Sequence, residues 1–278
     1  MTTYTPADVN AWYQAVQFRN GQDNTVASYV ALLNSGSITP AGVQDAIINE
    51  TYTAANVNTV IRLYQGAFNR VGDQGGLNYW ADTMGATPDA AKPAQLQAIA
   101  NQFASSSEFI STYGNIQGAS APINTAILTA FYQNILNRAP DTAGLTYWLN
   151  SGQNVGQVLN AFSQSQEFTL ASKPATVLFQ QAEIAGNAAT SGSLFQYGGF
   201  PGNTYTLTTG VDTVSIQGSW GVVNGTGTTF TANDSISAAA GSQGNKLVIA
   251  DTTGASALGV PSGVTVTNVQ TAQVSSNG

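Results

Sequence analysis

The sequence predicts two kinds of structure in separate domains: an all-α N-terminal domain of helical repeats, then an all-β segment that is solenoid- or sandwich-like. Two observations predict the helical part: the segment Tyr64–Trp80 recurs as Tyr132–Trp148, and apolar residues there follow helical spacing. A third observation predicts the β part. Beyond residue 203 the chain consists of short Thr-rich stretches of alternating polarity, separated by Gly, Asn and Asp.

The repeat consists of two motifs. The segments YQGAFNRVGDQGGLNYW and YQNILNRAPDTAGLTYW share Tyr, Gln, Asn, Arg, Asp, Gly, Leu, Tyr and Trp at the same offsets. Each is followed by a second match, FASSSEF (residues 103–109) and FSQSQEF (residues 162–168). A third, degenerate copy precedes both, with Tyr13 and Arg19 spaced as in the others. We therefore expect about three repeats in a helical domain of residues 1–190.

The helices are expected in the following order. Thr5-Pro6 and Thr39-Pro40 are typical helix starts, with a shorter helix between them that ends near Gly36. Each full copy then contributes a long helix, a turn, a short helix and a further helix that ends in the second motif. Pro174 is predicted to begin the last helix, and a Gly-rich linker over residues 191–203 leads to the β domain of residues 204–278. The predicted helices include approximately residues 26–34, 53–69, 93–103 and 174–186, and the third copy repeats the helices and turn of the second over residues 123–171.

The turn inside each copy holds the charged residues of the repeat. Asp73 and Asp141 stand where the N-cap of the second helix belongs. The repeated arginine is expected to pair with this Asp or to donate to turn carbonyls. The alternative is that the guanidinium binds an acidic sugar or phosphate, which makes Arg19, Arg70 and Arg138 the candidate glycan-binding residues. The repeated Glu108 and Glu167 are expected to cap a helix or to link repeats.

Composition excludes several classes of function. The chain has no His and no Cys, which removes Cys nucleophiles, His general bases and the usual zinc ligands. Its net charge of −7 disfavours nucleic acid as a partner. The sequence shows no Sec signal peptide and no apolar run long enough to span a membrane. No pair of acids forms a convincing catalytic frame, and we therefore expect a protein that is not an enzyme.

The repeat resembles a helical domain found in bacterial surface-layer (S-layer) and RTX-type secreted proteins. The order of parts, with LTTGVDT at Leu207–Thr213, is similar to S-layer proteins of the Caulobacter type. This resemblance implies an extracellular, cell-surface location, type I secretion and self-assembly into a two-dimensional lattice. It also implies calcium dependence and non-covalent anchoring of the helical domain to lipopolysaccharide O-antigen. Separately, the β segment ends in QVSSNG with no terminal helix or cap, and we expect it to be truncated.

Calcium can be sought in the β segment. RTX repeats bind calcium through GGxGxD turns, and the nearest equivalent here is Asp234–Leu247, with Gln243 or Asn245 in place of an Asp. The candidate metal ligands are therefore Asp212, Asp234 and Asp251. Their alternative role is that of turn residues that accept backbone hydrogen bonds.

Three functions remain open from the sequence. The first is a structural S-layer protein anchored to a surface polysaccharide. The second is the non-catalytic head of a type I-secreted adhesin, and the third is the accessory domain of a larger secreted enzyme.

Overall fold

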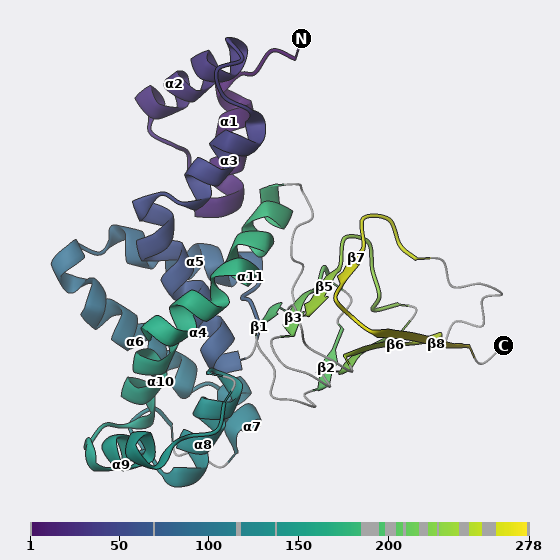
Figure 1. Ribbon diagram of the computed structural model, residues 1–278. Coiled ribbons are helices and arrows are strands. Elements are labelled where there is room, and N and C mark those ends of the chain that lie inside the picture. Colours follow the sequence, from purple (N-terminus) through teal and green to yellow (C-terminus); the bar gives the residue numbers. More distant parts are fainter. Residues whose placement is uncertain are drawn as a thin grey trace.

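The computed structural model describes residues 2–68, 70–114, 118–136, 138–184, 195–197, 204–207, 210–216, 222–226, 228–238, 245–251 and 260–276. In Figure 1 the helices form one elongated body, and the strands lie beside it, next to α4 and α11. The prediction of a helical N-terminal region is confirmed. Its helical elements are α1 (Pro6–Gln17), α2 (Asp23–Asn34), α3 (Pro40–Ile48), η1 (Thr53–Val57), α4 (Asn58–Phe68), α5 (Gln74–Ala86), η2 (Asp89–Ala91), α6 (Lys92–Ala104), α7 (Ser107–Tyr113), α8 (Thr125–Asn134), α9 (Thr142–Asn150), α10 (Val155–Ser163) and α11 (Gln166–Ile184).

Short polar side chains set most helix starts. Thr5 caps α1 in a reciprocal capping box with Asp8, and Pro6 occupies the first turn. Thr39 accepts a hydrogen bond from the Gly42 amide at the start of α3. Such caps satisfy amide groups that have no partner within the helix. The helix starts predicted at Thr5-Pro6 and Thr39-Pro40 are therefore confirmed.

Two features of the helical region differ from expectation. The helix expected over residues 53–69 begins with the π-helical turn η1 before continuing as α4. Pro174 does not begin a helix but lies inside α11, which runs from Gln166 to Ile184. A proline inside a helix removes the one hydrogen bond that its own nitrogen would donate, and its ring crowds the carbonyl four residues earlier. The surrounding helix here is long enough to continue through it.

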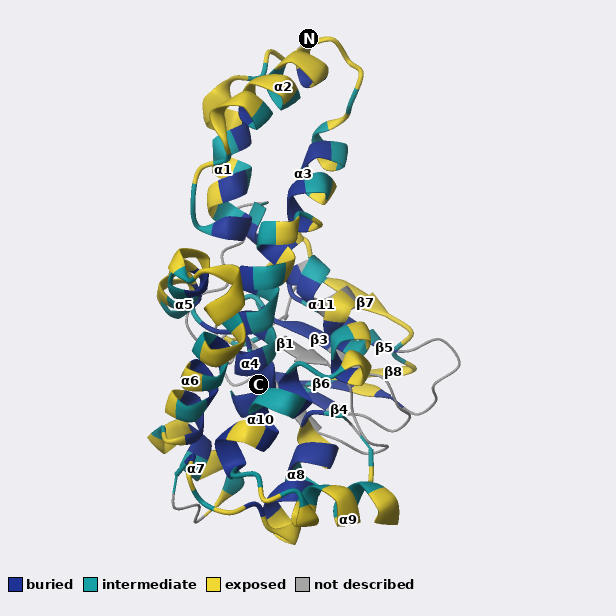
Figure 2. Cartoon of the chain, turned by 90° about the vertical axis from the view of Figure 1, so that its left-hand side faces the viewer, coloured by how far each residue is buried: buried dark blue, intermediate teal, exposed yellow. Residues whose placement is uncertain are grey.

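The helical region has two hydrophobic cores. Residues of α1–α3, including Val9, Val43 and Ile47, form the first. Residues of η1 and α4–α11, including Ile61 and Phe131, form the second and larger one. Helix α11 joins them, because Val177 and Ile184 pack against the first core and Phe179 belongs to the second. Figure 2 shows the central α4 mostly buried and α9 mostly exposed.

The β part consists of two four-stranded parallel sheets. Odd-numbered strands form one sheet in the order β1-β3-β5-β7, and even-numbered strands form the other in the order β2-β4-β6-β8. Successive strands thus alternate between the sheets, and Val214, Val223, Ile236 and Leu247 contribute to a small core of their own. The strands are β1 (Phe195–Tyr197), β2 (Thr204–Thr206), β3 (Thr213–Ile216), β4 (Val222–Thr226), β5 (Ser235–Ala238), β6 (Lys246–Asp251), β7 (Thr265–Thr267) and β8 (Thr271–Ser276).

The predicted linker, residues 191–203, contains a strand. Phe195–Tyr197 forms β1, whose residues pair in parallel with Thr213–Ser215 of β3. Helix α11 lies against β1 and β3, so the helical and β parts also contact each other. A three-residue strand carries too little periodicity to be recognised in a Gly-rich stretch, and its pairing depends on a distant segment. The rest of the linker, 191–194 and 198–203, lies outside the described residues.

Candidate functional site

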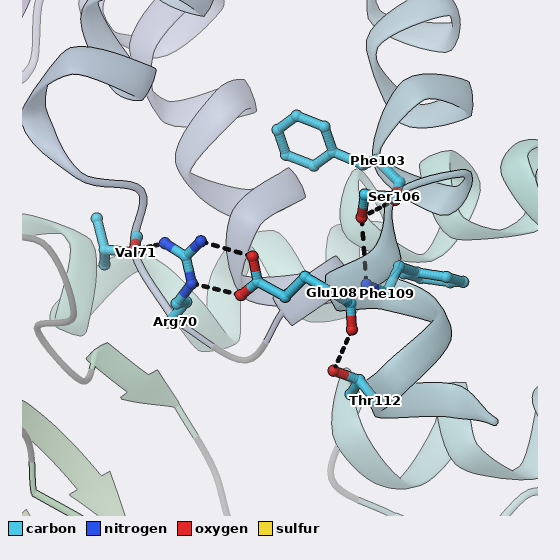
Figure 3. A network of polar contacts seen from close by, with 7 residues as sticks. All are labelled: Arg70, Val71, Phe103, Ser106, Glu108, Phe109 and Thr112. Carbon is cyan, nitrogen blue, oxygen red and sulfur yellow. Dashed lines mark hydrogen bonds and ion pairs between the residues drawn. The ribbon is translucent and has the colours of Figure 1, made fainter.

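The repeated arginine and the repeated glutamate form one ion pair in each full copy. In the second copy, Arg70 Nε and Nη2 donate to the two carboxylate oxygens of Glu108 at 2.6 and 2.8 Å, and Nη1 donates to the Val71 carbonyl at 3.0 Å (Figure 3). The hydrogen bond to Glu108 raises the pKa of Arg70. This is the two-pronged geometry in which a guanidinium matches a carboxylate.

The third copy repeats this arrangement. Arg138 Nε and Nη2 donate to Glu167 at 2.6 and 3.1 Å. The third nitrogen of Arg138 is 3.5 Å from both the Ala139 carbonyl and the Asp141 carboxylate. The expected partners, Asp and turn carbonyls, are therefore secondary, and the main partner is the glutamate of the second motif. The repeat equivalence of Glu108 and Glu167 was the signal that could have predicted this pairing.

The other repeated residues build the turn around this ion pair. Asp73 and Asp141 act as N-caps, as predicted, accepting hydrogen bonds from Gly76 and Gly144 at 2.8 and 2.7 Å. The hydrogen bond from the Gly144 amide lowers the pKa of Asp141. The repeated tyrosine lies so close to the repeated glycine, Tyr132 to Gly144 in the third copy, that a Cβ there would collide with its hydroxyl.

The second motif completes the same unit. Ser106 accepts a hydrogen bond from the Phe109 amide and so caps α7, which places Glu108 in its first turn (Figure 3). Phe103 stacks edge-on with Tyr64, at 4.7 Å between ring centroids. Ser165 caps the Phe168 amide in the third copy in the same way. Arg70 and Arg138, two of the predicted glycan contacts, are thus engaged within their own repeats.

Residues 100–171 match a domain of unknown function, DUF4214. The matching segment begins near the second motif of one copy and ends just after that of the next. Because it covers less than half of the chain, the match describes this region alone. The DUF4214 region contains both partners of the Arg138–Glu167 ion pair. No curated protein matches the chain.

The degenerate first copy differs at this position. Arg19 lies over the ring of Tyr52, 4.5 Å from its centroid, and its Nε contacts the Asn20 carbonyl at 3.4 Å. Glu50 is the first glutamate after Arg19, as Glu108 is the first after Arg70. It instead accepts hydrogen bonds from Tyr13 and from Gln17. Burial is the main cause of a raised pKa of Tyr13, and the hydrogen bond to Glu50 is the second cause. Arg19 and Glu50 line a pocket of about 280 Å³.

A second hollow lies between the first and second copies. Its volume is about 480 Å³, and no charged residue lines it. Helix α1 and Phe18 form one wall, and the start of α5 forms the other. Its polar lining consists of the amide side chains of Gln14, Gln74 and Asn78. Such amides can both donate to and accept from the hydroxyl groups of a sugar.

The repeated Tyr-Trp pairs divide between core and surface. Trp80 and Trp148 are half-buried and pack against the large core, while Tyr79 and Tyr147 are 63% and 64% exposed. Each tyrosine stacks edge-on against its neighbouring tryptophan, at 4.7 and 5.0 Å between centroids. The tryptophans thus support the fold, and the tyrosines offer an aromatic face to solvent.

Of the three predicted metal ligands, Asp212 and Asp234 lie beside each other in the β part. Asp234 is fully buried, and its carboxylate accepts hydrogen bonds from the backbone amides of Asp212 and Thr231, both at 2.8 Å. Burial raises the pKa of Asp234. Asp251 ends β6, in the sheet to which neither Asp212 nor Asp234 belongs, and Gln243 lies outside the described residues. Among the residues that the structure describes, no group of three or more acidic side chains could hold a metal ion.

Within the described part of the chain, no helix is both long and apolar enough to cross a membrane.

Proposed function

We propose that the chain is part of an S-layer-type structural protein on the cell surface, whose helical region anchors it to lipopolysaccharide O-antigen without catalysis. The resemblance of the repeat and of the LTTGVDT segment to such proteins supports this proposal. The same resemblance supports type I secretion as the route of export.

The observation that carries the proposal is the second hollow described above, the uncharged, amide-lined groove between the first and second copies. Gln14, Gln74 and Asn78 supply donors and acceptors for sugar hydroxyls, and Phe18 supplies an apolar surface. Each hydrogen bond contributes only about 0.5–1.5 kcal/mol after desolvation. A single groove therefore binds weakly, and a lattice of many copies raises the apparent affinity by roughly 10²–10⁴.

Self-assembly into a two-dimensional lattice is supported by the same resemblance. We propose that the alternation of strands between two parallel sheets is that of a solenoid, which is the architecture that such alternation builds.

Calcium has its place in this proposal as a bridge. The net charge of −7 repels anionic sugars, and divalent cations coordinated by carboxylate oxygens reduce that repulsion. Binding to an acidic glycan should therefore be stronger with calcium than with chelator.

The test is binding of the chain to smooth and rough lipopolysaccharide, with calcium and with chelator. The protein should be immobilised densely as well as used as a monomer, so that weak contacts are detected. We expect binding to smooth lipopolysaccharide and little to rough. Failure to bind smooth lipopolysaccharide in every format would reject the anchoring role.

Paired variants locate the site. Gln74→Ala with Asn78→Ala removes amides from the groove, and we expect weaker binding to smooth lipopolysaccharide. The control is Thr142→Ala with Thr146→Ala, at the equivalent and equally exposed positions of α9. If the control weakens binding as much as the groove variant, the groove is not the site.

A further inference from the structure

A pocket of about 350 Å³ lies between α11 and the segment that runs from the end of α3 through η1 into α4. Its volume falls at the lower end of the range for small-molecule sites, about 300–1,000 Å³. The charged side chains that line it are Arg62 and Lys173, and no carboxylate is among its lining residues. The protein has twice as many acidic as basic residues, 14 against 7. A pocket whose charged lining residues are all basic is therefore not what the composition alone would predict.

Arg62 is unlike the arginines of the full repeats. Its Nε and Nη2 both donate to the amide oxygen of Gln164, at 3.1 and 2.7 Å, whereas Arg70 and Arg138 each bind a carboxylate. Among the described residues, Arg62 forms no ion pair, and its side chain forms no hydrogen bond other than the two to Gln164. Burial lowers the pKa of Arg62 to about 10. A largely buried cation without a counter-charge is unfavourable, and a bound anion relieves that cost.

The neutral lining presents a donor beside these cations. Asn58 lines the pocket, and its Oδ1 accepts a hydrogen bond from Gln180 Nε2 at 2.8 Å. Because this bond occupies the oxygen, the Asn58 amide nitrogen is left as a donor. The hydroxyl groups of Ser172 and Thr176 also line the pocket, but they donate to the carbonyls of Phe168 and Ser172 at 2.7 and 3.0 Å, which leaves Asn58 as the neutral donor of the site.

The acidic groups near the lining residues have other partners. Glu50, next to Asn49, accepts hydrogen bonds from Tyr13 and Gln17, and Glu167 pairs with Arg138. Asp45 of α3 accepts from Gln181 at 3.5 Å, and Glu183 of α11 is buried beyond the pocket with contacts of its own. Neither lines the pocket. Arg62 and Gln164 also line a neighbouring hollow of about 520 Å³, in which Lys92 and Asp89 form an ion pair of 2.8 Å.

We propose that this pocket binds the carboxylate or phosphate group of an acidic sugar, held between the side chains of Arg62 and Lys173. Arg62 supplies a largely buried guanidinium, Lys173 the ammonium of an exposed side chain, and Asn58 a neutral donor. The inference that the anionic group belongs to a sugar rests on the proposed glycan anchoring. The inference that the pocket binds an oxyanion rests on the pocket alone.

The test is isothermal titration calorimetry of the whole chain with glucuronate, glucose 6-phosphate and inorganic phosphate, with neutral glucose as the control ligand. We expect all three anions to bind, glucose not to bind, and the affinity to fall as salt is raised. No heat from any anion at about 10 mM, tenfold above a Kd of 1 mM, would overturn the proposal.

Variants assign the site. Lys173→Gln changes an exposed residue and should fold normally, and we expect it to weaken anion binding about tenfold, equivalent to about 1.4 kcal/mol. Arg62→Gln should weaken binding further, and Arg62→Lys keeps the charge if the glutamine variant does not fold. The matched control, Lys92→Gln, removes an ion-paired cation from the neighbouring hollow and should bind as the unaltered chain does. Undiminished binding by Lys173→Gln and by the folded Arg62 variant would contradict the site.

The two proposals fail separately. Binding of phosphate and glucuronate without binding of smooth lipopolysaccharide retains the pocket and rejects the anchor. Binding of a neutral O-antigen that is unaffected by Lys173→Gln retains the anchor, and the anion titration then decides the pocket independently.

Discussion

The Arg70–Glu108 ion pair should contribute measurably to the stability of the helical region, although it lies near the surface. Exposed ion pairs usually contribute about 0.2–1 kcal/mol. This pair belongs at the upper end, because two hydrogen bonds of 2.6 and 2.8 Å join its members and the Arg70 side chain is only 26% exposed. We therefore expect a coupling energy of about 1 kcal/mol between the two side chains.

Arg70 makes further contacts that its partner does not share. Its guanidinium carbon lies 5.6 and 5.4 Å from the ring centroids of Tyr64 and Phe68, and its Nη1 donates to the Val71 carbonyl. A partly exposed cation–π contact contributes about 0.5–1 kcal/mol. Arg70→Ala should therefore lower the free energy of unfolding by about 1.5–2 kcal/mol, and Glu108→Ala by about 1 kcal/mol.

The equivalent pair of the third copy should be weaker. Arg138 is 40% exposed, and its second bond to Glu167 is 3.1 Å. We expect a coupling of about 0.5 kcal/mol there. Repeat equivalence alone would suggest that the two ion pairs stabilise the fold equally. The structure instead predicts that the Arg70 pair contributes more than the Arg138 pair.

The assay is a double-mutant cycle for each pair, measured by urea unfolding followed by circular dichroism at low and high salt. The cycle isolates the pair from the other contacts of each residue. The control pair is Asp89–Lys92, in which Asp89 is 96% exposed, and its coupling should be near zero. A coupling below about 0.2 kcal/mol for Arg70–Glu108, or one no larger than that of the control, would refute the reasoning.

Three further predictions concern single residues. Gly144→Ala places a Cβ against the Tyr132 hydroxyl and should cost about 1–3 kcal/mol in thermal unfolding, whereas Gly75→Ala, which meets only an aspartate oxygen at 3.3 Å, should cost less than half as much. Asp141 has a lowered pKa in the folded state, so its stabilising effect is present above its ordinary value of 3.8 and is lost as the pH falls below it. Thermal melts between pH 6 and pH 2 should show this loss, and Asp141→Asn should reduce it; an unchanged acid profile would contradict the assignment. Asp234→Ala removes the acceptor of two backbone amides and should destabilise the β part by about 1–3 kcal/mol per unsatisfied amide. The measurement is the near-ultraviolet circular dichroism spectrum and the melting temperature. If both are unchanged in the variant, the carboxylate is not structural.

What the sequence by itself determined about this protein is its local structure and its repetition. The helical region, its starts at Thr5 and Thr39 and the N-caps at Asp73 and Asp141 follow from side chains that act within a few residues of their own position. The repeat follows from direct comparison of two segments. These features depend on neighbours in sequence, which is the information that a sequence displays.

Only the tertiary structure decided which distant residues meet. Arg70 pairs with Glu108 rather than with Asp73, because α6 and the cap at Ser106 return the second motif to the turn. The short strand β1 exists through its pairing with β3, and its three residues carry no sufficient pattern of their own.

The pocket at Arg62 belongs to the same class. Arg62 lies outside the repeat position of the other arginines, and Lys173 is far from it in the chain, so no spacing links the two. Helix α11 continues through Pro174 and brings Lys173 beside α4. Long-range packing alone determines which charges are left without a counter-charge, because both the Coulomb energy and the cost of desolvation depend on distances in space and not on separation along the chain.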